Sequence, residues 1–280
     1  GAVYHSGSVA QPDPNMSMLR ILLLIATGLS PLAWSVQHYE VKVIDQKPQA
    51  RDHFVQGLEI LDDYLYVSVG NYGESRLLRY RFSDGRMDTV KHLDKQLFAE
   101  GLTVLGDSIY QLTWRNRAML VYRKTDLEFE RWLPLVGEGW GLTNNGTELI
   151  YSDGSAKLHF MSADRAHILR SITVTEQGRP VSLLNELEWV EGSIWANIWQ
   201  SDRIVVIDPD SGEVTASINL QGLLPAAEYR PGTDVLNGIA RNPADGAIWV
   251  TGKRWPWIYR IELESTAATS ESQQSEANSR

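Results

Sequence analysis

The chain has 280 residues, a formal net charge of −9 and no cysteine. This length allows one domain with a large core, and the negative charge argues against nucleic acid or an anionic membrane surface as a partner. The lack of cysteine excludes disulfides, a cysteine-linked lipid anchor and thiol catalysis.

The first 35 residues have the pattern of a targeting signal rather than of a folded domain. Arg20 precedes a short apolar run at 21–35 that ends in small residues. This order is typical of a secretory signal peptide, and the run is too short and too interrupted by proline for a stable membrane span. We therefore expect a disordered upstream extension at 1–15, a signal peptide at 16–35, and a secreted or periplasmic mature protein without a membrane anchor.

The remaining chain repeats one phrase five times: a polar residue or Trp, a Gly-Leu-like pair, a short turn, and an apolar strand that ends in Tyr or Trp. A period of about 40 to 50 residues with several short strands per copy is typical of a β-propeller, with one blade per repeat. The copies are QGLEILDDYLY (56–66), EGLTVLGDSIY (100–110), WGLTNNGTELIY (140–151), NELEWVEGSIW (185–195) and NGIARNPADGAIW (237–249).

Each phrase is followed by segments in which apolar residues alternate with polar ones, such as RLLRYRF (76–82) and RIVVIDP (203–209). Alternation bounded by Asp, Gly and Ser clusters indicates half-buried antiparallel strands. The fifth repeat lacks its last strand, whereas HYEVKVIDQ (38–46) has a strand pattern and no partner nearby. We predict an all-β, five-bladed propeller over 36–264, whose last blade is closed by this N-terminal strand, and a disordered polar tail at 265–280.

In a propeller, equivalent positions of successive blades face one central axis, so residues far apart in sequence meet there. Together, two such positions supply one carboxylate, one lysine, three amides and three tryptophans, which is the usual make-up of a small-ligand site. A single amide at such a position could equally cap a turn. The first ring contains Gln56, Glu100, Trp140, Asn185 and Asn237, and the second contains Gly70, Trp114, Ser155, Trp199 and Lys253.

Eight motifs, from FVQGL near the start of the first repeat to TGKRWP near the end of the last, resemble those of the plant and bacterial glutaminyl cyclases (glutaminyl-peptide cyclotransferases). The resemblance runs from about Tyr39 to Leu263 and implies a five-bladed propeller that converts the N-terminal glutamine of peptides to pyroglutamate and releases ammonia. The motifs are, in order, FVQGL, FAEGLT, LTW, EGWGL, LLNELEW, ANIW, LNGIA and TGKRWP.

The same resemblance implies roles for individual residues. The catalytic residues would be Glu100, Asn185 and Lys253. Because Glu100 is the one acidic member of either ring, it is expected to carry protons between the reacting nitrogens. The expected substrate-binding residues are Phe54, Gln56, Phe98, Trp114, Trp140, Trp199 and Asn237.

Two alternatives remain open at this point. In a calcium-dependent propeller hydrolase, Glu100, Asn185 and Asn237 would be oxygen ligands, although such sites usually add an Asp and neither ring has one. A non-catalytic propeller could instead display peptides on one face. The six histidines form no HxH or HExxH pair that would favour zinc. We expect no metal, no cofactor, a monomer, and peptides or proteins with N-terminal glutamine as partners.

Overall fold

The computed structural model describes residues 35–266. The predicted extension, nearly all of the predicted signal peptide and most of the predicted tail lie outside this range. The described residues form 22 β-strands and one short 3-10 turn, η1 (Ala226–Glu228), so the predicted all-β class is confirmed. None of the helices in this part of the chain is long and apolar enough to cross a membrane.

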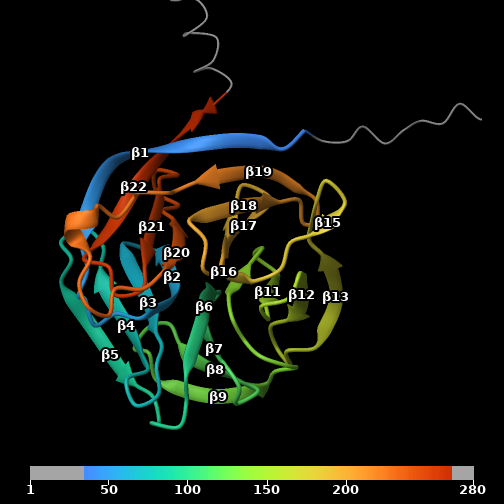
Figure 1. Ribbon diagram of the computed structural model, residues 1–280. Helices are drawn as coiled ribbons and strands as arrows, with labels where there is room; N and C mark the ends of the chain where they lie inside the picture. Colours follow the sequence, from blue (N-terminus) through green and yellow to red (C-terminus); the bar gives the residue numbers. More distant parts are fainter. Residues whose placement is uncertain (1–34, 267–280) are drawn as a thin grey trace, which may run out of the picture. The chain divides into compact units, whose positions relative to one another are not determined.

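Three sheets contain four strands each, in chain order, so that each consists of consecutive antiparallel hairpins. Figure 1 shows these sheets side by side around a centre, with β6 near it and β5, β9 and β13 on the outside. The strands are β2 (Val55–Leu61), β3 (Tyr64–Val69), β4 (Arg76–Arg81) and β5 (Met87–His92); β6 (Ala99–Leu105), β7 (Ser108–Thr113), β8 (Ala118–Arg123) and β9 (Phe129–Pro134); and β10 (Leu142–Asn144), β11 (Glu148–Ser152), β12 (Lys157–Ser162) and β13 (Ile168–Thr173).

A fourth sheet has eight strands in the order β16-β17-β18-β19-β1-β22-β21-β20. The N-terminal strand β1 pairs antiparallel with the C-terminal strand β22 from Tyr39 to Pro48, and parallel with β19 over Gln37–Tyr39 only. The strands are β1 (Gln37–Pro48), β16 (Leu184–Val190), β17 (Ser193–Ile198), β18 (Arg203–Ile207), β19 (Val214–Asn219), β20 (Leu236–Arg241), β21 (Ile248–Gly252) and β22 (Trp257–Ser265); β14 (Thr175–Glu176) and β15 (Arg179–Pro180) form a small hairpin.

The first strands of the repeats contact one another in the order β2, β6, β10, β16, β20 and again β2. The glycine of the repeated Gly-Leu pair lies where these strands approach. A Cβ added at Gly57 would lie 2.5 Å from the backbone nitrogen of Leu102, and one at Gly141 would lie 1.9 Å from the carbonyl oxygen of Asn185. The repeated glycine is therefore required by the close approach of neighbouring first strands.

The fourth repeat has Glu186 where the others have glycine. Its buried carboxylate accepts hydrogen bonds from the backbone N–H of Leu58 in β2 (3.2 Å) and of Ile239 in β20 (2.8 Å). Burial raises the pKa of Glu186 well above its ordinary value, with the nearby Glu188 contributing in the same direction. This one side chain thus links three first strands across the centre.

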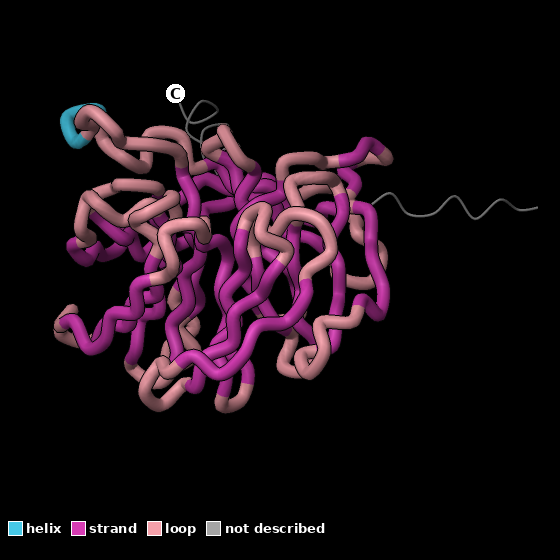
Figure 2. The backbone as a smooth tube through the Cα atoms, turned by 90° about the horizontal axis from the view of Figure 1, so that it is seen from below, coloured by secondary structure: helices cyan, strands magenta, loops and turns pink. Residues whose placement is uncertain are grey.

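Apolar residues from neighbouring sheets pack together to form the core. One buried cluster joins Tyr66 and Leu77 of the first sheet to Leu102 and Ile109 of the second. In Figure 2 the strands run between two edges at which the loops gather. The side chains that follow the strands at one such edge can therefore meet in one place.

Replacing Gly141 with Ala should destabilise the protein strongly, because the backbone contact at 1.9 Å leaves no room for a methyl group. We expect a loss of at least about 3 kcal/mol in the free energy of unfolding, measured by urea denaturation. Gly146→Ala is the control, because no atoms lie near a Cβ added at Gly146. Its positive φ (92°), which Gly141 does not share, should cost only about 1–2 kcal/mol. Equal losses in the two variants would show that the close approach is not the cause.

Candidate active site

A cavity of about 370 Å³ contains nine of the ten predicted site residues. They come from the first strands, from the residues just before them, and from the turns after the second strands of different repeats. The cavity is lined by Phe54, Gln56, Asn71, Phe98, Glu100, Trp114, Trp140, Asn185, Trp199, Gln200, Asp234 and Lys253.

Asn237, the tenth predicted residue, is fully buried and does not line the cavity. Its Nδ2 donates hydrogen bonds to Oε1 of Gln56 (3.2 Å) and to the carbonyl oxygen of Val55 (2.9 Å). Asn237 therefore contacts Gln56 rather than the cavity, and its predicted contact with a substrate stays a prediction. Because Oε1 of Gln56 is occupied in this way, its Nε2 faces the carboxyl of Glu100.

Glu100 lies in β6 with only 5% of its surface exposed, and Oε1 accepts a hydrogen bond from Nε2 of Gln56 (3.2 Å). Burial raises the pKa of Glu100 well above its ordinary value; the charge of Lys253 opposes this rise, and that of Glu138 adds to it. The backbone carbonyl of Glu100 accepts a hydrogen bond from the hydroxyl of Ser68 in the preceding sheet. The cavity thus holds a buried carboxyl whose proton affinity is raised by its surroundings.

Lys253 follows β21 and is 4% exposed. Burial lowers the pKa of Lys253, while the carboxylates of Glu100 and Asp234 oppose that effect. Its Nζ lies 4.7 Å from the centre of the Phe54 ring, so the ammonium faces an aromatic surface. The next residue, Arg254, has a φ of 62°, which is a backbone conformation commonly found at functional sites.

The amide of Asn185 provides an acceptor without a partner. Its Oδ1 is buried and makes no hydrogen bond with any described residue. The backbone carbonyl of Asn185 accepts a hydrogen bond from the hydroxyl of Ser152 (2.6 Å), which fixes the start of β16. Since the side chain lines the cavity, Oδ1 is available to an N–H group of a ligand.

Aromatic rings form the walls of the cavity. Phe54 and Phe98 have ring centres 6.3 Å apart, and Phe98 and Trp114 have centres 5.4 Å apart. On the other side, Trp140 and Trp199 pack edge to face with centres 5.6 Å apart. These rings give the cavity apolar walls around its polar groups.

Three lining residues were not expected from the sequence: Asn71, Gln200 and Asp234. Asn71 and Gln200 come directly after second-ring positions and have positive φ values of 83° and 63°. Extending the second ring by one residue would have found them. Asp234 lies outside both registers, in the longer connection between the fourth and fifth repeats, so the repeat gives no signal for it.

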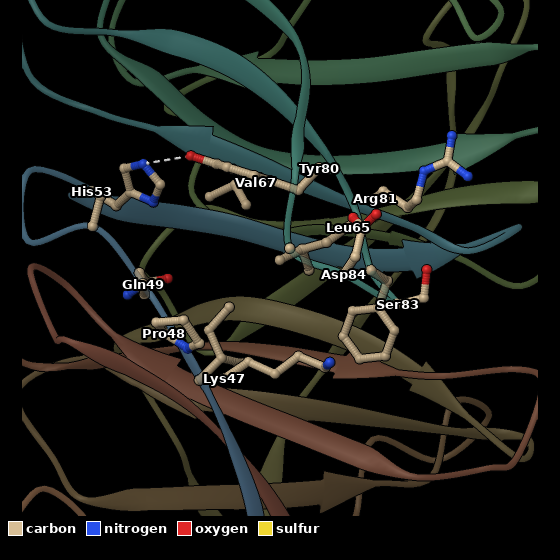
Figure 3. Close-up of a pocket in the computed structure, with 14 residues that line it drawn as sticks. Lys47, Pro48, Gln49, His53, Leu65, Val67, Tyr80, Arg81, Ser83 and Asp84 are labelled. Atoms are coloured by element: carbon tan, nitrogen blue, oxygen red, sulfur yellow. Dashed lines mark hydrogen bonds between the residues drawn. The ribbon is translucent and has the colours of Figure 1, made fainter.

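A second cavity, of about 280 Å³, lies between the end of β1 and strands β3 and β4 (Figure 3). Tyr80 Oη lies 3.1 Å from Nε2 of His53, and burial lowers the pKa of His53 to about 4, so this histidine is neutral at pH 7. Asp84 is the one carboxylate among the residues that line this cavity, and it is exposed. The second cavity therefore lacks a buried carboxyl, and the acid-base groups lie in the first.

The described residues contain no group of three or more His, Cys, Asp or Glu side chains arranged to hold a metal ion. The calcium alternative needs Glu100, Asn185 and Asn237 around one ion. Asn237, however, is fully buried and does not line the cavity that Glu100 and Asn185 share. The geometry of these three side chains therefore does not favour that alternative.

A family model described as glutamine cyclotransferase matches residues 17–263. The chain belongs to this family. The glutaminyl-peptide cyclotransferase of Arabidopsis thaliana is 35% identical over 237 residues, which are 82% of this chain and 73% of that protein. The crystal structure of Myxococcus xanthus glutaminyl cyclase matches with a TM-score of 0.77 and 32% identity, over 83% of this chain and 100% of that one. The resemblance predicted from the eight motifs is thus confirmed.

Replacing Lys253 with Met should raise the pKa of Glu100 further, because the ammonium is the charge that favours the ionised carboxyl. The pKa can be followed by ¹³C NMR of glutamate side-chain carboxyls, with Glu100→Gln to assign the signal. Lys91→Met is the control, since Lys91 pairs with Glu128 instead and should leave this pKa unchanged. A lower or unaltered pKa in Lys253→Met would contradict the proximity of the two charges.

Proposed function

We propose that the protein is a glutaminyl-peptide cyclotransferase that converts the N-terminal glutamine of peptides to pyroglutamate and releases ammonia. The observation that carries this proposal is the buried carboxyl of Glu100, with its raised pKa, in a cavity that also holds a buried lysine and an unpartnered amide oxygen. Family membership and the names of the two relatives support the same reaction.

The reaction joins two groups of one residue. The α-amine nitrogen attacks the carbon of the γ-carboxamide, a new C–N bond closes the five-membered lactam, and the bond from that carbon to the carboxamide nitrogen breaks. Because both groups belong to one molecule, the protein has to fold the glutamine side chain back rather than bring two reactants together. The aromatic walls suit this task, since they enclose the methylene groups of that side chain.

Glu100 is proposed to move the proton. The α-amine has a pKa of about 8 and is mostly protonated at pH 7, so it first loses one proton to solvent. The neutral amine loses a second proton as it attacks, and Glu100 accepts that proton. The same carboxyl then gives this proton to the departing nitrogen, which leaves as ammonia, and Glu100 returns to its ionised form. The raised pKa of Glu100 suits this double role, because a carboxyl with a higher proton affinity is a stronger base and, once protonated, still an acid.

The neighbouring polar groups are proposed to stabilise charge and orient the substrate. Lys253 faces the cavity beside Glu100, where its ammonium can stabilise the γ-oxygen as negative charge develops on it. The unpartnered Oδ1 of Asn185 can accept a hydrogen bond from the α-amine or the carboxamide nitrogen. Gln56, held by Asn237, would fix the orientation of the Glu100 carboxyl.

We further propose that residues 36–264 form a five-bladed propeller closed by β1. The cyclic contacts of the five first strands support this count. The eight-stranded sheet divides naturally into β16–β19 and a second set of four, β20, β21, β22 and β1, because β1 pairs with β22 over most of its length. The signal peptide, export and a monomeric state remain predictions from the sequence.

A propeller that only binds peptides is the competing function. Binding alone would not need a buried carboxyl with a raised pKa beside a buried lysine with a lowered one, since both shifts cost free energy in the folded state. Mass spectrometry of a Gln-initiated peptide incubated with the protein separates the two functions. Loss of the mass of ammonia supports the enzyme, and an unchanged peptide that nevertheless binds supports the alternative.

Replacing Glu100 with Gln keeps the shape of the side chain and removes the proton acceptor. We expect kcat to fall by about 10² to 10⁴-fold with little change in substrate binding, measured by steady-state release of ammonia. In the wild type, kcat/KM should rise with pH through the raised pKa of Glu100, because only the ionised carboxyl acts as a base. A Glu100→Gln enzyme with near-normal turnover would remove Glu100 from the proton path.

Cyclisation should continue in excess EDTA, because the side chains of the cavity form no complete set of metal ligands among the described residues. The measurement is the initial rate before and after prolonged dialysis against the chelator. A rate that disappears on chelation and returns with calcium or zinc would show that the reaction needs a metal.

A further inference from the structure

The aromatic wall of the cavity consists of two halves, one ending in Trp114 and the other beginning with Trp140. Among the described residues, no ring contact joins these two tryptophans. Trp114 follows β7, whereas Trp140 precedes β10, so the two side chains also come from different sheets. Another group therefore has to fix the position of Trp114 relative to Trp140.

Glu138, in the loop between β9 and β10, makes that connection. Its Oε2 accepts hydrogen bonds from Nε1 of Trp114 (2.8 Å) and from Nε1 of Trp140 (3.1 Å). Its other oxygen, Oε1, accepts a hydrogen bond from Nε of Arg115 (3.1 Å), whose guanidinium also lies 3.8 Å from the centre of the Trp114 ring. Oε2 of one carboxylate therefore holds two cavity tryptophans, and Oε1 holds the arginine that stacks on one of them.

The Glu138 carboxylate is ionised at neutral pH. Partial burial raises its pKa, but hydrogen bonds from Trp140, Trp114 and Arg115 more than offset that effect, and the net result is a lowered pKa. Hydrogen bonds to an ionised acceptor are stronger than those between neutral groups. Since both indole N–H groups are occupied, Trp114 and Trp140 present only apolar surface to whatever enters the cavity.

We propose that Glu138 is a positioning residue for the cyclisation: it locks Trp114 and Trp140 into the wall that folds the glutamine side chain back onto its own α-amine. This inference rests on the proposed function. Glu138 has a second, electrostatic effect, because its negative charge disfavours the ionised form of Glu100 inside the same cavity. Removing Glu138 should thus alter both the shape of the wall and the pH at which Glu100 titrates.

Kinetics of Glu138→Ala and Glu138→Gln test the proposal. Glu138→Ala should raise KM for a Gln-peptide about tenfold with a smaller change in kcat, because substrate binding loses its ordered wall. Glu138→Gln should recover part of this loss, since its amide oxygen still accepts from an indole. Glu128→Gln, which removes an exposed ion-paired carboxylate away from the cavity, is the matched control and should behave as wild type.

The pH profile separates positioning from a general loss of stability. Glu138→Gln removes the negative charge, so the pKa of Glu100 should fall and the acidic limb of kcat/KM should move to lower pH. A variant that was only less stable would keep the wild-type pH dependence of kcat/KM on the acidic side. The proposal would be overturned if Glu138→Ala left KM unchanged and Glu138→Gln left the acidic limb of the kcat/KM profile at its wild-type pH.

The last readout does not depend on activity. The indole N–H signals of Trp114 and Trp140 can be assigned in ¹H–¹⁵N spectra with Trp114→Phe and Trp140→Phe. In Glu138→Ala both signals should shift and exchange faster with water, whereas unchanged signals would overturn the proposal even if the enzyme were active. Should wild-type protein fail to cyclise Gln-peptides, the proposed function fails, and these two signals still decide whether Glu138 holds the tryptophans.

Discussion

The close approach of five first strands around one centre is the constraint on which the rest of the structure depends. Glycine satisfies it in the first three repeats, because any side chain at Gly57, Gly101 or Gly141 would meet the backbone of the next strand. Glu186 satisfies it in the fourth repeat by turning its carboxylate into an acceptor for two other first strands. The site exists because this approach also brings the residues that neighbour these positions, Glu100 and Asn185 among them, to the edge of one cavity.

Within the cavity, the opposing effects on Glu100 set its proton affinity. Burial raises its pKa, the charge of Lys253 lowers it, and that of Glu138 raises it. The hydroxyls of Ser68 and Ser152 hold the backbone of Glu100 and Asn185 from the preceding sheets, so the reactive groups sit on rigid supports. Precise placement matters here, because a cyclisation within one residue gains from orientation more than from proximity alone.

The repeats in the sequence predicted the all-β class and most of the residues that line the cavity. Glu100, Asn185 and Lys253 share a cavity because the first strands of the repeats contact one another around one centre, and the spacing of the repeats reveals which positions face it. The direction of a side chain depends on packing that spacing does not encode, which is why Asn237 contacts Gln56 instead of the cavity. Glu138 lies two residues before Trp140, a position of the first ring, and Asp234 lies in the irregular connection between the fourth and fifth repeats. Neither occupies an equivalent position of the repeats, so the spacing of the repeats could not reveal them. Their places beside the cavity follow only from three-dimensional contacts.

The residues that line the cavity extend along the chain from Phe54, just before the first repeat, to Lys253, which follows β21 in the fifth repeat. A nascent chain that is still being synthesised therefore lacks part of the cavity until its last strands have emerged from the ribosome. In addition, the pairing of β1 with β22 joins segments separated by nearly the whole described chain. Contacts of such large sequence separation form late and slowly in folding. Assembly of the site therefore coincides with completion of the fold, so that catalysis can begin only in a chain that has been synthesised and folded to its final strands.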